Sequence, residues 1–271
     1  MTVRSGFRGA SADAFAVLSD QLGGVAESSA NAVADDLFAV AASLRAEGAL
    51  RRFATDATVP VEARAGLAGE LFEGKVDPAS LELLKAAVSR RWTSSRDLAD
   101  ALELLGVVAV VRSSGADSGR LTDELFAVRS LLGDDSDLRN ALSDPARSVA
   151  DKAALVDTLL EGKALPATVT LVKQSLAGSY RTVVAALEDY EKVAADVHGQ
   201  RVATVHVARP LADAEAQRLT DALSRQYGMP VHLNVVVDPA VIGGIRVEIG
   251  DDVIDGTVSS RLDDARRRLA G

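Results

Sequence analysis

The chain has 271 residues, a formal net charge of −9 at pH 7 and no cysteine, which excludes disulfides, thiolate metal sites and a cysteine nucleophile. Its acidic balance, without a concentrated basic face, argues against a nucleic-acid-binding protein. Hydrophobic residues make up 48% and aromatic residues only 4%, and this alanine- and leucine-rich mixture favours closely packed helices over a β-sandwich.

The sequence shows no signal for insertion into a membrane or export across one. No apolar run approaches the roughly 18 to 20 residues that span a bilayer. The first residues, MTVRSGFRGASADAF, lack the apolar core of about 7 to 15 residues that a signal peptide needs. We therefore expect a cytoplasmic protein; if it works at a membrane, other proteins hold it there.

The first clear helical pattern covers residues 34–48. Its apolar residues recur at helical spacing and form one face, made of Leu37, Val40, Ala41 and Leu44. Gly48 follows them and is predicted to end this helix.

Two further helices follow in the first third of the chain. Pro60 is placed as a first-turn proline of a helix that Gly74 stops. Asp77 is a candidate N-cap for the next helix, with Pro78 in its first turn. Trp92, in the tetrapeptide SRRW, either anchors a partner or closes this helix against its own bundle.

The N-terminal part of the chain repeats itself at an offset of 88 residues. DDLFAV at 35–40 matches DELFAV at 123–128, and LFEGK at 71–75 matches LLEGK at 159–163. The same offset aligns further pairs, namely Leu50-Arg51 with Leu138-Arg139, Asp56 with Asp144, Leu67 with Leu155, Pro78 with Pro166, and Lys85 with Lys173. A single offset over this span predicts a duplicated helical unit.

The boundary between the two copies falls on a helix that both can use. Residues 95–111 align backward with 7–23 and forward with 183–199. We therefore expect a first helical bundle over 1–94, which is the extra copy, and a second over 95–198 that shares the helix near 95–111. A separate domain is expected over 199–271.

From about residue 199 the pattern changes to the alternation typical of strands. RVATVHV and VHLNVVV alternate, and Ile245, Val247 and Ile249 do so again. One helical face between the first two strands contains Leu219, Ala222, Leu223 and Tyr227, and the tail helix aligns Val258, Leu262, Ala265 and Leu269. The predicted order is β-α-β-β-α. The expected fold class is mainly α, with a duplicated N-terminal helical bundle followed by a small α+β C-terminal domain.

A glycine pair in this last domain invites comparison with phosphate-binding loops. Gly243 and Gly244 lead into a strand rather than a helix, and no Gly-Lys-Ser/Thr follows them. A turn that needs positive φ before a half-buried strand is therefore favoured over a phosphate site.

Three aspartates and three histidines are the remaining candidates for metal chemistry. Asp251, Asp252 and Asp255 lack the spacing of a calcium loop, and a hairpin turn at Gly250-Asp251-Asp252 explains the first two. Asp255 or Thr257 is predicted to cap the last helix. The histidines, His198, His206 and His232, have no supporting third ligand at a suitable spacing, so solvent-facing strand positions are favoured for those on strands. We expect no catalytic residue, no metal and no cofactor.

The stretch VDPAVIGGIRVEIGDDVIDGTVSSRLDDARRRL closely resembles the C-terminal signature of the delta subunit of F-type ATP synthase, whose mitochondrial counterpart is the oligomycin sensitivity-conferring protein. The resemblance covers roughly residues 95–271. Its signature and structural residues are Asp238, Pro239, Gly243, Gly244, Gly250, Asp251, Asp255 and Gly256. The usual family member has one N-terminal bundle, and the duplication here resembles an actinobacterial type.

This resemblance implies a structural role rather than catalysis. It implies a peripheral-stalk subunit that links the catalytic head to the membrane sector and resists rotor torque during proton-driven ATP synthesis. The implied partners are the N-terminal helices of alpha subunits for the bundle and the b subunit for the C-terminal domain. The implied location is the cytoplasmic face of the bacterial plasma membrane, as a peripheral protein without nucleic-acid partners.

The helical part of the chain is where we expect a partner helix to dock. The resemblance implies a groove between the helices near 9–22 and 78–92, with an equivalent near 95–111 and 166–177 in the second copy. Candidate partner-binding residues are Leu18, Leu83, Val88, Leu104, Leu171 and Leu176. Two alternatives stay open, a helical-repeat adaptor unrelated to ATP synthase and an enzyme that uses the C-terminal turn as a phosphate or metal site.

Overall fold

The computed structural model describes residues 6–250 and 252–270, with no side chains described for 263–265 and 268–270. The chain divides into two compact units, the first ending at Val197 and the second beginning at His198. The expected fold class is confirmed, because the first unit is built of helices and the second contains a small sheet with helices. No helix in the described part of the chain is both long and apolar enough to cross a membrane.

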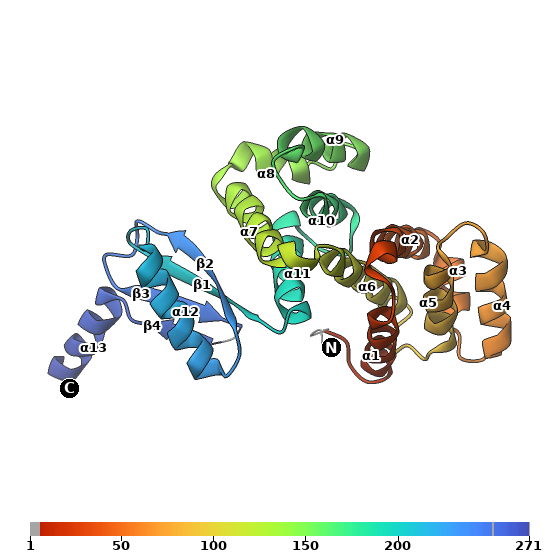
Figure 1. Ribbon diagram of the computed structural model, residues 1–271, viewed down its shortest axis with the longest axis horizontal. Helices are drawn as coiled ribbons and strands as arrows, with labels where there is room; N and C mark the ends of the chain where they lie inside the picture. Colours follow the sequence, from red (N-terminus) through yellow and green to blue (C-terminus); the bar gives the residue numbers. More distant parts are fainter. Residues whose placement is uncertain (1–5, 251, 271) are drawn as a thin grey trace. The chain divides into compact units, whose positions relative to one another are not determined.

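The first unit is formed by eleven α-helices and one short 3-10 helix in its described part (Figure 1). Their bounds are α1 Ala10–Gly23, α2 Glu27–Ala46, α3 Gly48–Thr55, α4 Val61–Phe72, α5 Pro78–Ser89, α6 Asp97–Ser113, η1 Gly115–Asp117, α7 Ser118–Asp134, α8 Ser136–Ser143, α9 Val149–Leu160, α10 Pro166–Ala177 and α11 Val183–Val197.

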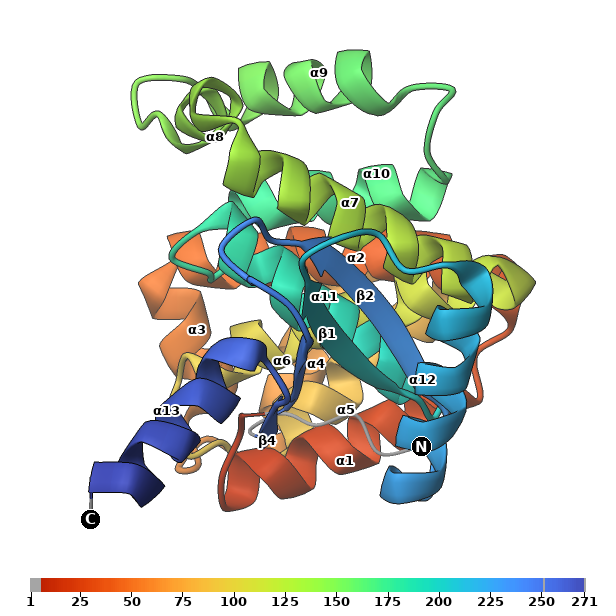
Figure 2. The same ribbon diagram turned by 90° about the vertical axis from the view of Figure 1, so that its left-hand side faces the viewer.

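The sequence repeat is a repeat of helices. Helices α8, α9 and α10 begin 88 residues after α3, α4 and α5 (136 − 48, 149 − 61 and 166 − 78), and each pair has equal length. Helix α9 lies beside α10 in both views, and α4 lies beside α5 in the first (Figures 1 and 2). The duplicated segment therefore folds into the same order of helices twice.

Helix α6 contacts both copies. It packs against α1, α2 and α3 on the N-terminal side of the chain and against α7, α10 and α11 on the C-terminal side. The buried apolar residues of both copies form one continuous core. The boundaries 1–94 and 95–198 therefore divide a single packed unit, and they stay a prediction.

The residues predicted to begin or end helices do so at some helix ends and not at others. Asp77 caps α5, because its Oδ1 accepts a hydrogen bond of 2.8 Å from the Ala79 amide, and Pro78 is the first helical residue. Gly74 adopts a φ of 72° just after α4. The prediction for Gly48 was wrong, because α2 ends at Ala46 and Gly48 begins α3. Pro60 precedes α4 rather than lying within it.

The second unit contains β1 Arg201–Val207, α12 Asp213–Tyr227, β2 Val231–Val237, β3 Ile245–Ile249, β4 Asp252–Asp255 and α13 Val258–Ala270. The sheet order is β2-β1-β3-β4, with β1 and β2 parallel and the other pairs antiparallel. The predicted order β-α-β-β-α was wrong by one strand, because the residues of β4 were expected to form a turn and the segment that connects it to the last helix. Its apolar pair, Val253-Ile254, does not alternate with polar residues, so it gave no strand pattern.

One face of this sheet is buried beneath α12. Alternate residues of β1, Ala203, Val205 and Val207, are buried together with Leu223 of α12 and Val247 of β3. This alternation is the reason that the sequence pattern identified β1 and β3. The second unit therefore has a core of its own.

Candidate partner-binding surfaces

The glycine pair in the C-terminal unit forms a tight structural contact with the segment that precedes α13. Gly244 has a φ of 82°, and a Cβ there would lie 2.4 Å from the carbonyl oxygen of Gly256. The Gly243 carbonyl accepts a 2.9 Å hydrogen bond from the Val258 amide, and the Ile245 carbonyl accepts one of 2.9 Å from Gly256. These backbone contacts occupy the turn, so it holds α13 against the start of β3.

The aspartates of the same stretch stabilise turns. Asp238 Oδ1 accepts a 2.8 Å hydrogen bond from the Ala240 amide across Pro239. Asp255 Oδ1 accepts one of 2.9 Å from the Thr257 amide, and this hydrogen bond lowers the pKa of Asp255. Thr257 Oγ1 in turn accepts from the Ser260 amide at 3.2 Å, so Thr257 is the residue that caps α13. Gly250 takes a φ of 58° in the β3–β4 hairpin, whereas Asp251 lies outside the described residues.

The described residues contain no group of three or more histidine, aspartate or glutamate side chains arranged to hold a metal ion. His206 is opposite Val236 and His232 is opposite Val202 in the parallel β1–β2 pair, so the two histidines stand four residues apart along the strands. Both are half-buried, less open than the expected solvent-facing positions. Burial lowers the pKa of His198.

The C-terminal stretch also carries an exposed apolar surface. Among the described residues, eleven large hydrophobic side chains are exposed, and six of them are Val237, Ile242, Val253, Ile254, Val258 and Leu262. Ile242 is 79% exposed and is joined through Gly243 to the backbone of Val258. Exposed apolar residues gathered in one segment are typical of a protein–protein contact. Ala265 and Leu269, predicted on the same face of α13, have no described side chains.

The six predicted partner-binding residues divide into two groups by exposure. Leu18, Leu83 and Leu171 are 0%, 1% and 0% exposed and belong to the hydrophobic core. Val88, Leu104 and Leu176 are half-buried and pack against that core. A charge at Leu83 or Leu171 would be placed in the core and would disturb folding as well as any binding. The partner role of all six residues stays a prediction.

The helices expected to form the docking sites lie side by side. Helix α1 packs against α5, and α6 packs against α10. On α1, Val17 is 40% exposed beside the exposed Ala16. Trp92 closes the end of α5 against its own bundle, because its Nε1 donates a 3.0 Å hydrogen bond to the Ala87 carbonyl. Trp92 is therefore not a free anchor.

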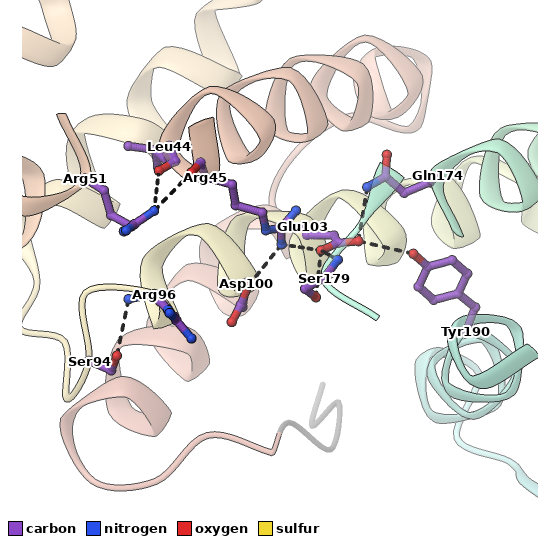
Figure 3. Close-up of polar contacts among 10 residues, drawn as sticks. All are labelled: Leu44, Arg45, Arg51, Ser94, Arg96, Asp100, Glu103, Gln174, Ser179 and Tyr190. Atoms are coloured by element: carbon purple, nitrogen blue, oxygen red, sulfur yellow. Dashed lines mark hydrogen bonds and ion pairs between the residues drawn. The ribbon is translucent and has the colours of Figure 1, made fainter. Parts of the chain in front are cut away.

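A buried polar junction, which the sequence did not indicate, joins the two copies (Figure 3). Glu103 of α6 is 2% exposed and pairs with Arg45 of α2. Its carboxylate also accepts hydrogen bonds of 3.1 Å from Gln174 Nε2 and 3.3 Å from the Tyr190 hydroxyl. The Ser179 amide and hydroxyl donate to it at 3.2 and 3.1 Å. One glutamate thus links α2 to α10, α11 and the segment between them.

The negative charge of Glu103 in this junction is compensated by its ion pair with Arg45 and by the hydrogen bonds that it accepts. Burial and the nearby Glu103 carboxylate raise the pKa of Tyr190, so its hydroxyl stays protonated and donates. Gly178 gives the carboxylate room, because a Cβ at that position would lie 1.9 Å from Glu103 Oε1. The equivalent glutamate one repeat later, Glu191, is also 2% exposed and pairs with Arg129 at 2.6 Å. Such pairing is the condition under which carboxylates are tolerated in a core.

Comparison with known proteins identifies the family. A family model described as ATP synthase delta (OSCP) subunit matches residues 108–269. A protein named ATP synthase subunit delta from Nocardioides sp. is 57% identical over 98% of both chains. Proteins of the same name from Kineococcus radiotolerans, 45% identical over 88% of this chain and 87% of its own, and Streptomyces coelicolor, 41% identical over 98% and 99%, are also similar. These matches confirm the resemblance, including its actinobacterial type, and the chain belongs to the ATP synthase delta (OSCP) subunit family.

Proposed function

We propose that this chain is the peripheral-stalk subunit that links the catalytic head of an F-type ATP synthase to its membrane sector and resists rotor torque. The observation that carries this proposal is the match to proteins named ATP synthase subunit delta over nearly the whole chain. Two compact units with separate hydrophobic cores suit a connector that binds different partners with its two parts. The chain is then a structural, non-catalytic subunit.

The proposed partner of the helical unit is the N-terminal helix of an alpha subunit. An amphipathic helix binds by laying its apolar face between two helices of its receptor. The outer side of α1 beside α5 offers an apolar strip, Ala16 and Val17, between Asp13 and Asp20, all exposed. A helix with an apolar stripe and basic flanks complements this arrangement.

The proposed partner of the C-terminal unit is the end of the b subunit. The exposed apolar residues of β4 and α13 supply a surface that is otherwise left in water, with Val253 and Leu262 each 55% exposed. Burying apolar area stabilises a complex by roughly 25 cal/mol per Å² before the costs of association. Through these two contacts the chain lies at the cytoplasmic face of the bacterial plasma membrane as a peripheral protein.

Affinity capture with the tagged full-length chain tests this function. The chain should capture both alpha and b subunits from its own cells. Val17→Asp should reduce capture of alpha while retaining b, and Leu262→Asp should reduce capture of b while retaining alpha. Arg218→Ala, on the exposed side of α12, is the matched control and should retain both. Absence of ATP synthase subunits from the full-length capture would contradict the proposal.

A further inference from the structure

Helices α1 and α6 hold equivalent places in the two copies but differ in what surrounds them. Position by position, the offset of 88 residues aligns α1 with the body of α6. On α1, an outer face is exposed to solvent, made of Ala10, Asp13, Ala16, Val17, Asp20 and Gln21. Three of these six side chains are polar, as expected for a helix surface in water.

The same positions on α6 are apolar and covered. They are Leu98, Ala101, Leu104, Leu105, Val108 and Ala109, of which all but Leu104 are at most 1% exposed. Leu104 is half-buried, and no residue from Asp97 to Ser113 is exposed. At three of these positions α1 has a polar residue and α6 an apolar one, with Asp13, Asp20 and Gln21 replaced by Ala101, Val108 and Ala109. This is the difference expected between a helix face exposed to water and one in contact with protein.

Helices of the first copy pack against α6 and have no counterpart around α1. Helices α5 and α6 contact α1 just as α10 and α11 contact α6, so these neighbours leave the face open in the first copy. The neighbours of α6 without a comparable counterpart around α1 are α7 and the first-copy helices α1, α2 and α3. Leu98 of this face lines an apolar cavity together with Val40, Leu44 and Leu50 of the first copy.

The last helix of the second copy supports this assignment for part of the face. Helix α11 is equivalent to α6 in its role as the sixth helix of a bundle, and Ala186 and Val193 occupy the places of Leu98 and Leu105. Both are buried, at 0% and 4% exposed. The equivalents of the other four positions are half-buried or exposed, namely Asp189, Lys192, Asp196 and Val197. The place of a sixth helix therefore accounts for the burial of Leu98 and Leu105, and not for that of the whole face.

We infer that the duplication does not double the docking site: the first bundle fills the α6 side of the second copy's site, and only the α1–α5 side remains open to a partner helix. A chain of this kind then binds one partner helix in this mode, through its first bundle. The ion pair between Arg45 and Glu103 also ties α2 to α6. The identity of the partner rests on the proposed function, whereas the burial of this face of α6, called its closure below, does not.

Cysteine labelling tests the closure directly, since the chain has no cysteine of its own. Single variants are made at equivalent positions, Val17→Cys with Leu105→Cys and Gln21→Cys with Ala109→Cys, and reacted with a thiol reagent. The α1 cysteines should react within about 10-fold of their rate in denaturant. The α6 cysteines should react at least ~100-fold more slowly, because labelling there requires local opening.

The two α6 variants change volume in opposite directions, so packing damage does not affect both alike. Leu105→Cys removes volume and Ala109→Cys adds a sulfur atom, and circular dichroism verifies that each is folded. Equal labelling rates at Gln21→Cys and Ala109→Cys in a folded chain would overturn the inference. Equal rates of all four variants in denaturant are the control.

Titration of the full chain with a peptide of the alpha-subunit N-terminal helix separates this inference from the proposed function. One peptide per chain, with binding at least ~10-fold weaker in Val17→Asp, is the expected result. Two peptides per chain would overturn the inference and leave the proposed function standing. No binding would count against the proposed alpha contact, and the labelling rates would still decide whether α6 is closed.

Discussion

Asp36 and Glu124, which stand 88 residues apart, make the same two hydrogen bonds in the two copies. Asp36 Oδ2 accepts from the Asp77 amide at 2.8 Å and from Ser80 Oγ at 2.6 Å. Glu124 Oε2 accepts from the Leu165 amide at 2.8 Å and from Thr168 Oγ1 at 2.6 Å. The Asp36 carboxylate thereby holds the start of α5 against α2, and the Glu124 carboxylate holds the start of α10 against α7. The residue type differs at all three positions, because Asp36, Asp77 and Ser80 correspond to Glu124, Leu165 and Thr168.

Removal of the Glu124 carboxylate should destabilise the helical unit. Glu124→Ala leaves the amide of Leu165 and the fully buried hydroxyl of Thr168 without their acceptor. We expect a loss of about 1–3 kcal/mol in the free energy of unfolding, measured in urea. Glu82→Ala, which removes an exposed carboxylate of α5, is the control and should change stability by less than about 0.5 kcal/mol. Equal effects of the two variants would contradict this account.

The same carboxylate should make stability depend on pH in the acid range. Burial of Glu124 acts to raise its pKa, but hydrogen bonds from Thr168, Leu165 and Arg120 outweigh burial and lower the pKa below its usual 4.5. Because the folded pKa is the lower one, the stabilisation is present above pH 4.5 and is lost as pH falls through the folded pKa. The stability gap between the native chain and Glu124→Gln should therefore shrink from pH 7 to about pH 3. A gap that stays constant over this range in urea titrations would refute the assignment.

The sequence predicted elements whose signals are local and repeated. The helices of the two copies follow from apolar spacing and from an offset that keeps Pro78 and Pro166 in register. The cap at Asp77 needed only the residues beside it. Strand β4 was missed because it is a short edge strand whose residues are all exposed, so burial imposes no alternation on it.

The polar junction and the closure of α6 could not be predicted, because they depend on distant residues. Glu103 meets Arg45, 58 positions before it, and Tyr190, 87 positions after it. A single glutamate in an apolar helix does not specify such partners. The docking residues Leu18, Leu83 and Leu171 were chosen for their apolar character, which does not distinguish a core position from a groove. Their partner role stays a prediction.

A methyl group at Gly244 should disrupt the C-terminal turn. Alanine there would adopt a φ of 82° and place its Cβ 2.4 Å from the Gly256 carbonyl oxygen. We expect Gly244→Ala to destabilise the C-terminal unit by about 2–4 kcal/mol. Gly250→Ala is the matched control, since it shares a positive φ of 58° but meets no atom within 4 Å. It should be destabilising by only about 1–2 kcal/mol.

Hydrogen exchange distinguishes the two glycine variants within the second unit. The amides of Gly256 and Val258 donate across this turn, to Ile245 and Gly243. They should exchange much faster in Gly244→Ala and change little in Gly250→Ala. Similar protection in both variants would show that the close approach of Gly244 to Gly256 does not stabilise the unit.

Gly178 and Glu103 should be energetically coupled. Gly178 has an ordinary φ of −80°, so the effect of Gly178→Ala arises from the clash of the new Cβ with Glu103 Oε1, 1.9 Å away, rather than from backbone strain. The displaced carboxylate would lose hydrogen bonds from Ser179 and Gln174, with an expected loss of about 2–3 kcal/mol in urea unfolding. Gly66→Ala within α4, where no atom lies within 4 Å, is the control and should be neutral or stabilising by up to about 1 kcal/mol.

A double-variant cycle separates this coupling from a general effect of added volume. Glu103→Ala alone should be destabilising, because Arg45, Ser179 and Tyr190 lose their common acceptor. In that background the side chain that Gly178→Ala would strike is gone, so the second change should have little further effect. The combined loss should thus fall short of the sum of the single losses by at least about 1 kcal/mol. Additive losses would mean that Gly178 is not needed to seat the Glu103 carboxylate between the two copies.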